Sequence, residues 1–319
     1  MSKDKKKILV IDSANLYHSN KYDWIKGSVN NLVEPFLEQI EVLVKEFFPD
    51  IIVLCNDEYK SKYRVNLTKG YKGKRLEQAK KYTKREKEAN NLVKQLKKNL
   101  KLFKGVFVYG GVKDVEADDI MSILYHDARL QNYDIKVISQ DKDLLTTINY
   151  NDLYDWKKER YKTLEDRLHF TKNEWVFFQS AQGDESDSVV GITGVGAKTA
   201  EKIVRKYHTV NNLLQNAEKD LDSEEVKKDW RLRKALERVL TKEGKEEFKL
   251  SYQLVKIMRD KSLLEDYQDK EYEQIIQEIL NFKKPSEEEC ISDELEDFLF
   301  ETQAFKASDI IKEINYYVS

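Results

Sequence analysis

Cysteine is scarce in this chain of 319 residues, which contains only Cys55 and Cys290. The two residues lie far apart in the sequence and cannot build a disulfide framework or the grouped ligands of a structural zinc site. A low cysteine content is typical of a reducing compartment, so we expect a cytoplasmic location. Because Cys55 lies within an apolar run, we also expect it in the core.

Long apolar runs, internal repeats and an overall excess of basic residues are missing as well. The apolar run nearest to the N-terminus covers residues 8–11, which is too short for a signal peptide, and no run approaches the length of a membrane-spanning helix. The formal net charge of −2 gives the whole chain no basic signature. We therefore expect a soluble protein with no membrane partner, folded as one large domain or two smaller ones.

Short apolar runs alternate with helix-like segments in the first half of the chain. Four runs are typical of buried strands, namely residues 7–11, 51–54, 106–109 and 135–138. Helical apolar spacing is found in three longer segments, namely residues 29–48, 80–104 and 171–182. This order predicts an α/β fold with a central, mostly parallel sheet.

The second half of the chain has mostly helical spacing beyond residue 207. A helix is predicted over residues 226–240, with Trp230 in the core. After Pro285 an acidic stretch with embedded aromatic residues precedes a helix predicted over residues 307–317. We expect this final segment to pack back onto the protein.

Carboxylates follow successive predicted strands or open the next helix. They are Asp12, Asp57, Glu116, Asp118, Asp119, Asp141 and Asp143. Parallel sheets bind ligands at the carboxyl edge of their strands, so these side chains are expected at one edge. No histidine or cysteine accompanies them, and ligand sets made only of oxygen suit Mg²⁺ or Mn²⁺. So many carboxylates in one cleft would repel each other unless two divalent ions lay among them, and such a pair can drive phosphodiester hydrolysis.

Residues 183–198 combine two further acids with a glycine-rich turn. Asp184 and Asp187 are spaced one helical turn apart, and Gly191, Gly194 and Gly196 precede a helix that opens at Ala197. That helix carries four basic side chains, Lys198, Lys202, Arg205 and Lys206. Glycine lets a backbone approach a ligand closely, and the free amides of a helix N-terminus favour a phosphate. The segment therefore predicts cation ligands at one end and a phosphate seat at the other.

Two other phosphate chemistries are suggested by single motifs and are disfavoured. Residues 191–199 nearly spell a P-loop, but one extra residue separates the second glycine from Lys198, and a helix rather than a strand is expected upstream. The Asp141-x-Asp143 pair is similar to that of haloacid-dehalogenase phosphatases. Those enzymes place the pair after their first strand, where this chain offers only Asp12.

A strongly basic section lies between residues 60 and 104, where lysine and arginine outnumber acids by 17 to 3. Its centre joins an aromatic ring to several cations, at Tyr71, Lys72, Lys74 and Arg75. Cations beside aromatic rings suit contacts with phosphates and stacked bases. We expect this section to bind nucleic acid.

Taken in order, six motifs closely resemble the flap endonuclease/5′-3′ exonuclease family of the PIN-like 5′-nuclease superfamily, in particular its bacteriophage type with phage RNase H and 5′-exonuclease. The motifs are Ile-Asp-Ser-Ala-Asn (11–15), Cys-Asn-Asp (55–57), Tyr-Lys-Gly-Lys-Arg (71–75), Val-Glu-Ala-Asp-Asp (115–119), Ser-Gln-Asp-Lys-Asp (139–143) and Gly-Asp-x-x-Asp with Gly-x-Gly-Ala-Lys (183–198). The resemblance covers roughly residues 7–260. The chain departs from it at Gln140 and Lys142, where relatives often have Thr or Ser and then Gly, and in the tail after Pro285.

The resemblance implies a PIN-like nuclease domain over residues 1–180, with a helical arch at about 59–104. It implies a helix–three-turn–helix and a helical C-terminal region over residues 181–285, and an acidic tail with a terminal helix over 286–319. It further implies two Mg²⁺ ions, which Mn²⁺ can replace, and K⁺ at the helix–three-turn–helix.

Residue roles also follow from the resemblance. One metal would be held by Asp57, Glu116, Asp118 and Asp141, with Asp12 acting partly through water, and the other by Asp143, Asp184 and Asp187; the place of Asp119 stays open. Lys72 would stabilise the charge of the scissile phosphate, with Arg75 near it. The turn from Gly191 through Gly194 and Gly196 to Lys198, together with Lys202, would bind the uncut strand of the duplex.

The function implied is a structure-specific 5′-3′ exonuclease and flap endonuclease that hydrolyses DNA flaps and RNA primers during replication and repair. Its partners would be branched or flapped DNA and RNA–DNA hybrids, with single-strand-binding protein or a clamp as candidate replication partners. The enzyme would be a monomer in the cytoplasm, which is that of the host if the chain is phage-encoded. Two other functions stay open. A PIN-type endoribonuclease would not need residues 183–206, and a non-cleaving branched-DNA binding protein would not need the full set of carboxylates.

Overall fold

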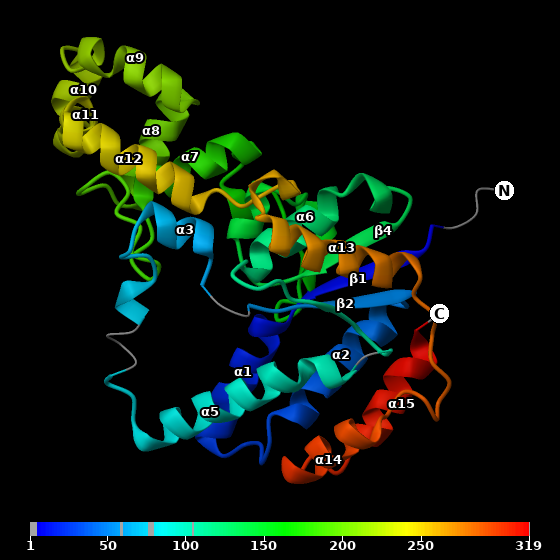
Figure 1. Ribbon diagram of the computed structural model, residues 1–319. Helices are drawn as coiled ribbons and strands as arrows, with labels where there is room; N and C mark the ends of the chain where they lie inside the picture. Colours follow the sequence, from blue (N-terminus) through cyan, green and yellow to red (C-terminus); the bar gives the residue numbers. More distant parts are fainter. Residues whose placement is uncertain (1–4, 58–59, 76–79, 104, 319) are drawn as a thin grey trace.

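The structure is a computed structural model that describes residues 5–57, 60–75, 80–103 and 105–318 (Figure 1). One six-stranded sheet lies at its centre, in the order β3-β2-β1-β4-β5-β6. The strands are β1 (Lys7–Asp12), β2 (Ile51–Cys55), β3 (Val108–Gly110), β4 (Asp134–Ile138), β5 (Leu153–Asp155) and β6 (Arg160–Tyr161). All neighbouring strands pair in parallel except β5 with β6. The predicted α/β fold with a mostly parallel sheet is confirmed.

The central strands are buried on both faces, which explains their continuous apolar sequences. In β1, Ile8 and Val10 contact one hydrophobic core, whereas Leu9 and Ile11 contact another. This alternation follows from the two-residue period of a strand. Cys55 at the end of β2 is fully buried, as predicted.

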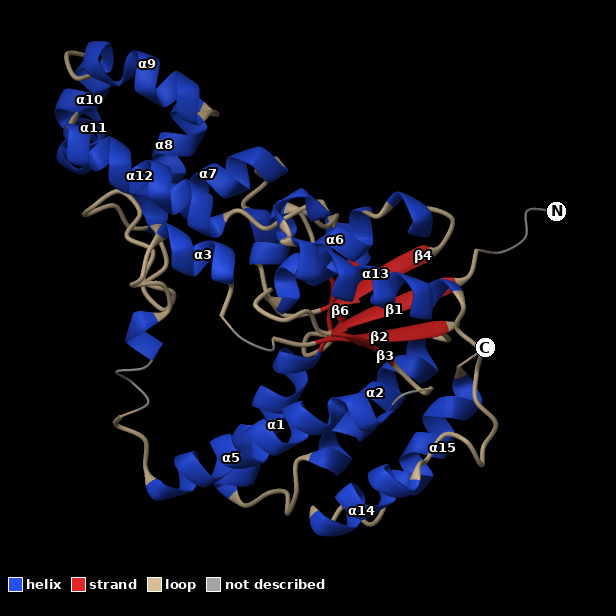
Figure 2. Ribbon diagram, in the orientation of Figure 1, coloured by secondary structure: helices blue, strands red, loops and turns tan. Residues whose placement is uncertain are grey.

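Helices cover both faces of the sheet (Figure 2). One face carries α6 (Ala117–His126) and α13 (Asp266–Leu280). The other carries α1 (Ser13–Lys26), α2 (Val33–Phe47), α5 (Lys84–Asn99), α14 (Asp293–Glu301) and α15 (Ala307–Tyr317). The tail thus packs back as expected, because Leu295 and Ile311 are buried in the same core as Phe36 of α2.

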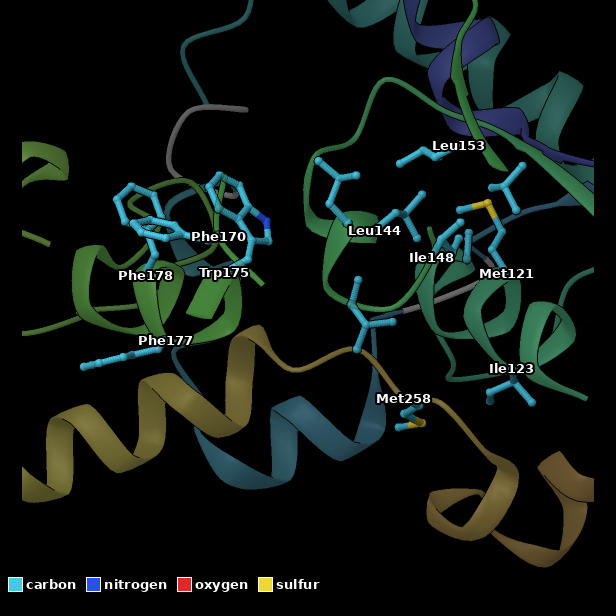
Figure 3. Close-up of a cluster of buried hydrophobic side chains, with 14 of the residues drawn as sticks. Met121, Ile123, Leu144, Ile148, Leu153, Phe170, Trp175, Phe177, Phe178 and Met258 are labelled. Atoms are coloured by element: carbon cyan, nitrogen blue, oxygen red, sulfur yellow. The ribbon is translucent and has the colours of Figure 1, made fainter. Parts of the chain in front are cut away.

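The remaining helices extend from one end of the sheet (Figure 1). They are α3 (Lys62–Leu67), α7 (Lys172–Gln182), α8 (Ala197–Tyr207), α9 (Val210–Asp220), α10 (Glu224–Lys228), α11 (Trp230–Leu240) and α12 (Lys242–Val255). Single turns of 3₁₀ helix occur at residues 100–103, 128–130, 143–146, 150–152, 165–167 and 261–263. Figure 3 shows how Phe170, Trp175 and Phe178 pack together around α7, in the same core that contains Leu153 and Met121. Because this core continues from the sheet into the helices, the domain boundary at residues 180 and 181 stays a prediction.

Three helices were not anticipated, and the reasons are local. Helix α1 buries only Ser13, Leu16, Tyr17 and Asn20, so its apolar signal is weak. Helix α3 has a single buried side chain, that of Arg64, which is charged. Helix α14 lies within the acidic stretch and begins at the Ser292 cap, whose hydroxyl accepts a hydrogen bond from the Leu295 amide.

The predicted helix over residues 226–240 is wrong in one respect. Asp229 interrupts it and caps α11, accepting hydrogen bonds from the amides of Arg231 and Leu232. The break places Trp230 at the first residue of α11 with 63% of its surface exposed, instead of in the core. No helix among the described residues is long and apolar enough to cross a membrane.

Candidate nuclease site

Eight of the nine predicted metal ligands line one cleft of about 960 Å³ at the carboxyl edge of the sheet. They are Asp12, Asp57, Glu116, Asp118, Asp141, Asp143, Asp184 and Asp187. Lys72 and Arg75 from the basic section also line the cleft. The parallel strands explain most of this convergence, since six of the acids follow the carboxyl end of a strand or begin the next helix, whereas Asp184 and Asp187 follow α7.

Asp12 ends β1 and caps α1. Its carboxylate accepts hydrogen bonds from the amide and side chain of Asn15 at 3.2 and 2.6 Å, and from the Ser139 hydroxyl at 2.8 Å. Burial raises the pKa of Asp12 to about 7, although the Ser139 hydrogen bond opposes this and Asp57 adds to it. A nearby cation would therefore favour the ionised form of Asp12 at neutral pH.

Glu116 stands before α6 and lies between three side chains of the basic section. It accepts hydrogen bonds from Lys72 Nζ at 2.5 Å, Arg64 Nη1 at 2.9 Å and the Tyr71 hydroxyl at 3.0 Å. Burial alone would raise the pKa of Glu116, but Lys72 and Arg64 hold it below its ordinary value. Glu116 is thus ionised and ties the basic section to the cleft.

Asp119 is the one predicted ligand that the structure removes from the cleft. It is fully buried, and Arg64 donates to both of its oxygens, at 2.5 and 3.0 Å. The Met258 amide also donates to it, at 2.9 Å. Asp119 lies one residue after Asp118 on α6, so its side chain points to a different side of the helix. Its role is to neutralise a buried arginine, and the metal-ligand prediction for it is wrong.

Asp141 and Asp143 lie in a tight loop after β4. The amide of Asp143 donates to the Asp141 carboxylate at 2.7 Å, and the Gln179 side chain donates to Asp143. Burial, reinforced by the charges of Asp141 and Asp184, raises the pKa of Asp143 to about 8. Burial raises the pKa of Asp118 and of Asp141 as well. These carboxylates repel each other when they are ionised, and an added cation would offset this repulsion.

Asp184 and Asp187 lie in a turn rather than on a helix. Backbone hydrogen bonds between Asp184 and Val189 close this turn at 2.7 and 2.9 Å. A β-carbon on Gly183 would lie 2.6 Å from the Val189 carbonyl oxygen, and both Gly183 and Gly191 have positive φ values. The two glycines therefore allow the acidic turn to pack directly against the glycine-rich turn.

Lys162, directly after β6, is a functional candidate that sequence reasoning did not identify. Only 1% of its side chain is exposed, and its Nζ donates to the Asp155 carboxylate at 2.8 Å and to the Gln140 carbonyl at 3.1 Å. The second bond holds the loop that carries Asp141 and Asp143. No local pattern indicates this role, because the ion pair depends on the antiparallel pairing of β5 with β6.

The carboxylate oxygens of the cleft are suitable ligands for divalent cations, but the side chains are not arranged as a complete coordination site. Across the part of the chain that the structure describes, no three of the acids are close enough together to form a metal site as they stand. Several carboxylates are instead turned toward protein donors, as Glu116 is toward Lys72 and Asp187 toward Arg75 at 2.5 Å. Rotation of these side chains within the cleft would be needed for them to share an ion.

The predicted DNA-binding residues differ in exposure, and Lys72 is half-buried in the cleft against Glu116. Lys74, Arg75, Gly194, Gly196, Lys198 and Lys202 are exposed, and a β-carbon on Gly194 or Gly196 would meet no atom within 4 Å. Tyr71 and Gly191 are buried instead. The Tyr71 ring packs with Val189 and Leu254 and is not available for stacking on a base, and the Gly191 amide donates to Ser251 at 2.9 Å. Both residues support the site from within, which corrects the prediction of direct contact.

The glycine-rich turn does not belong to a P-loop. Helix α7 precedes it, as the sequence predicted, whereas a P-loop follows a strand. The turn leads directly into α8, whose first residue is Ala197. The exposed amides at the start of α8 are suited to a phosphate.

Known families match this architecture over residues 7–278. The family described as "5′-3′ exonuclease, N-terminal resolvase-like domain" matches residues 7–176, and "5′-3′ exonuclease, C-terminal SAM fold" matches residues 170–278. A 5′-3′ exonuclease of Aquifex aeolicus is 27% identical over 251 residues, which cover 74% of each chain.

Solved structures from bacteriophage T5 share the fold. A T5 5′-exonuclease with bound zinc superimposes with a TM-score of 0.68 at 22% identity, covering 85% of this chain and 99% of that one. The T5 D15 flap endonuclease, in a pseudo-enzyme–product complex with DNA and metal ions, gives a TM-score of 0.66 at 20% identity, covering 85% and 98%. The predicted fold and family are thereby confirmed.

Replacing Lys162 should destabilise the protein strongly. Lys162→Met leaves the Asp155 carboxylate buried without its main partner, and breaking a buried pair in this way costs about 3–5 kcal/mol. Lys158 is the matched control, because its ammonium lies 3.8 Å from Asp155 but is 53% exposed. Lys158→Met should cost less than about 1 kcal/mol. Urea unfolding of both variants measures the difference, and equal costs would contradict the role assigned to Lys162.

Proposed function

This chain belongs to the 5′-3′ exonuclease family and is a nuclease that hydrolyses phosphodiester bonds, and we propose that it uses two divalent cations, Mg²⁺ or in its place Mn²⁺, to remove DNA flaps and RNA primers from duplex DNA. The observation that carries the proposal is the cleft in which the eight predicted ligands meet Lys72 and Arg75. Relatives in the T5 structures were crystallised with metal ions, and one of them with DNA.

The proposed ligands fall into two groups within the cleft. Asp57, Glu116, Asp118 and Asp141 form one, with Asp12 acting partly through water, and Asp143, Asp184 and Asp187 form the other. When bound, the two ions supply an activated water and stabilise the leaving oxygen. The raised pKa values of Asp12 and Asp143 support the proposal, because an ionised pair of such groups requires a nearby positive charge.

Lys72 and Arg75 are the proposed contacts for the scissile phosphate. Burial lowers the pKa of Lys72, but Glu116 and Asp57 more than offset this and raise it above its ordinary value. The pKa of Arg75 is raised by Asp187 in the same way, against an opposing effect of burial. Both side chains are therefore cationic at neutral pH, and a phosphate could exchange with the carboxylates that they now contact.

The exposed turn at Gly194 and Gly196, with Lys198 and Lys202 on α8, is the proposed seat of the uncut strand. Free amides at the start of α8 and two exposed ammonium groups suit the backbone of that strand. K⁺ bound by backbone carbonyls of this turn forms part of the proposal. We also propose that the enzyme acts as a monomer together with replication proteins such as single-strand-binding protein or a clamp.

A PIN-type endoribonuclease is the weaker alternative. It would not need Asp184 and Asp187, yet both line the cleft with the other acids. Because the chain belongs to the 5′-3′ exonuclease family, we reject a non-cleaving DNA-binding protein as its function.

The substrate proposal is tested with a 5′-flap duplex labelled at either end of the flap strand. Cutting near the junction is expected with Mg²⁺ and should stop with EDTA, while the two labels separate flap release from exonucleolytic trimming. An RNA–DNA hybrid should also be degraded from its 5′ end. Cleavage of single-stranded RNA alone, with the flap left whole, would overturn the proposal in favour of an endoribonuclease.

Asp143→Asn should abolish cleavage and spare binding. Asparagine matches the shape of the protonated carboxyl that burial favours, so the fold should keep its stability, but the proposed ligand charge is lost. We expect turnover to fall by about a hundredfold or more, with the Kd for the flap substrate nearly unchanged. Glu185→Gln is the matched control, because Glu185 lies in the neighbouring turn with 87% of its side chain exposed. Unchanged turnover in Asp143→Asn would contradict the metal assignment.

Metal binding should stabilise the protein more at high pH than at low pH. The carboxyl groups of Asp12 and Asp143, with pKa values raised to about 7 and about 8, favour the fold while protonated, so stability is lost as the pH rises through these values. A divalent cation binds the ionised form and offsets this loss. The gain in Tm on adding Mg²⁺ should reach about 5 °C at about pH 8.5 and nearly vanish at about pH 5.5.

The control for this measurement is NaCl of matched ionic strength. Equal gains in Tm at both pH values would show that protons and Mg²⁺ do not compete for the same carboxylates.

A further inference from the structure

Trp230 is a large aromatic side chain that the fold leaves in solvent. It begins α11 after the break at Asp229, and 63% of its surface is exposed. Trp175 by comparison is buried in the core with 6% exposed. Neither the cleft nor the core accounts for the position of Trp230.

Two cations accompany the exposed indole. The guanidinium of Arg231 lies 5.1 Å from the centroid of a Trp230 ring, and Nζ of Lys234 lies 6.0 Å from it. We call these three residues the Trp230 cluster. Within the described part of the chain neither cation forms an ion pair with a carboxylate, whereas Arg233 on the same helix pairs with Glu237 at 2.9 Å. The cluster thus offers positive charge and an aromatic surface together.

The Trp230 cluster adjoins the proposed seat of the uncut strand. Asp229, which precedes Trp230, pairs with Nζ of Lys202 at 2.5 Å. Lys202 follows Lys198 by one turn of α8, and that helix begins at Ala197 beside the exposed glycine turn. Helices α8, α10 and α11 lie together in the helical region that extends away from the sheet (Figure 1). A strand seated at the start of α8 therefore has the cluster as its neighbour farther from the cleft.

We propose that the Trp230 cluster is a second nucleic-acid contact, which binds the duplex arm where it continues beyond the α8 seat. Arg231 and Lys234 contact phosphates, and the indole packs on an adjacent sugar or base face. Cations that border an exposed aromatic ring are the combination that nucleic acid backbones favour. The proposal rests on the proposed function, because α8 is taken as the seat of the uncut strand.

Binding measured in EDTA, where no cleavage occurs, separates this proposal from the question of catalysis. Two flap substrates share the same junction, but the duplex arm of one ends at the α8 seat while the other continues for one more turn of DNA. Trp230→Ala should raise the Kd of the long-arm substrate about fivefold or more and leave that of the short-arm substrate unchanged. Trp230→Phe should retain most of the affinity.

Charge variants provide the matched control. Arg231→Gln combined with Lys234→Gln should reduce the slope of log K against log salt by about 2 on the long arm, whereas Arg233→Gln should not change it. Because all of these side chains are exposed, thermal unfolding should be nearly unaffected, which excludes misfolding as the cause.

Two results would overturn the proposal, namely an unchanged Kd of Trp230→Ala for the long-arm substrate and an equal loss of affinity for both substrates. Failure of the wild-type protein to cleave either substrate in Mg²⁺ would instead count against the proposed function and would leave the binding result intact.

Discussion

Repulsion among carboxylates is the constraint to which most of this structure responds. Eight of the predicted ligands converge on one cleft, six of them because parallel strands end at a common edge, and Asp184 and Asp187 through the turn after α7. Burial raises the pKa of several of them, so the ionised site needs positive charge from outside the sheet. The protein supplies part of that charge from Lys72 and Arg75, both of which come from the basic section. Divalent cations would supply the rest.

Arg64 connects this electrostatic centre to the rest of the molecule. Its side chain is 4% exposed, and its guanidinium donates to Glu116, to Asp119 and to the carbonyls of Leu254 and Lys256. It therefore joins α3, the start of α6 and the segment that leaves α12. A buried arginine would be costly without such partners, and removal of any one of them would leave a charge unsatisfied. Together with the packing of Tyr71 on Leu254, this side chain connects the basic section, the cleft and the helical region.

The sequence predicted the site better than it predicted the surroundings. Asp12, Asp57 and Asp141 could be placed at one edge because apolar runs marked the strands and parallel strands share an edge. Asp119 could not be separated from Asp118, since adjacent residues on a helix differ in direction, and only packing decides which of them faces the cleft. Tyr71 and Gly191 were assigned to DNA contact by their neighbours in sequence, but both are covered by Leu254 and Ser251 from the distant helix α12.

What the sequence by itself determined is the position of the main strands and of most longer helices, the parallel sheet and the gathering of most predicted carboxylates at its edge. Each of these follows from patterns within a few residues, or from motifs that recur in the family. Only the tertiary structure decided which charges are paired and which side chains reach solvent. Lys162 is buried because β6 pairs antiparallel with β5, and Trp230 is exposed because Asp229 ends one helix and caps the next. Such outcomes depend on contacts between segments far apart in the chain, or on the choice of a break between two helices, and local periodicity does not encode them.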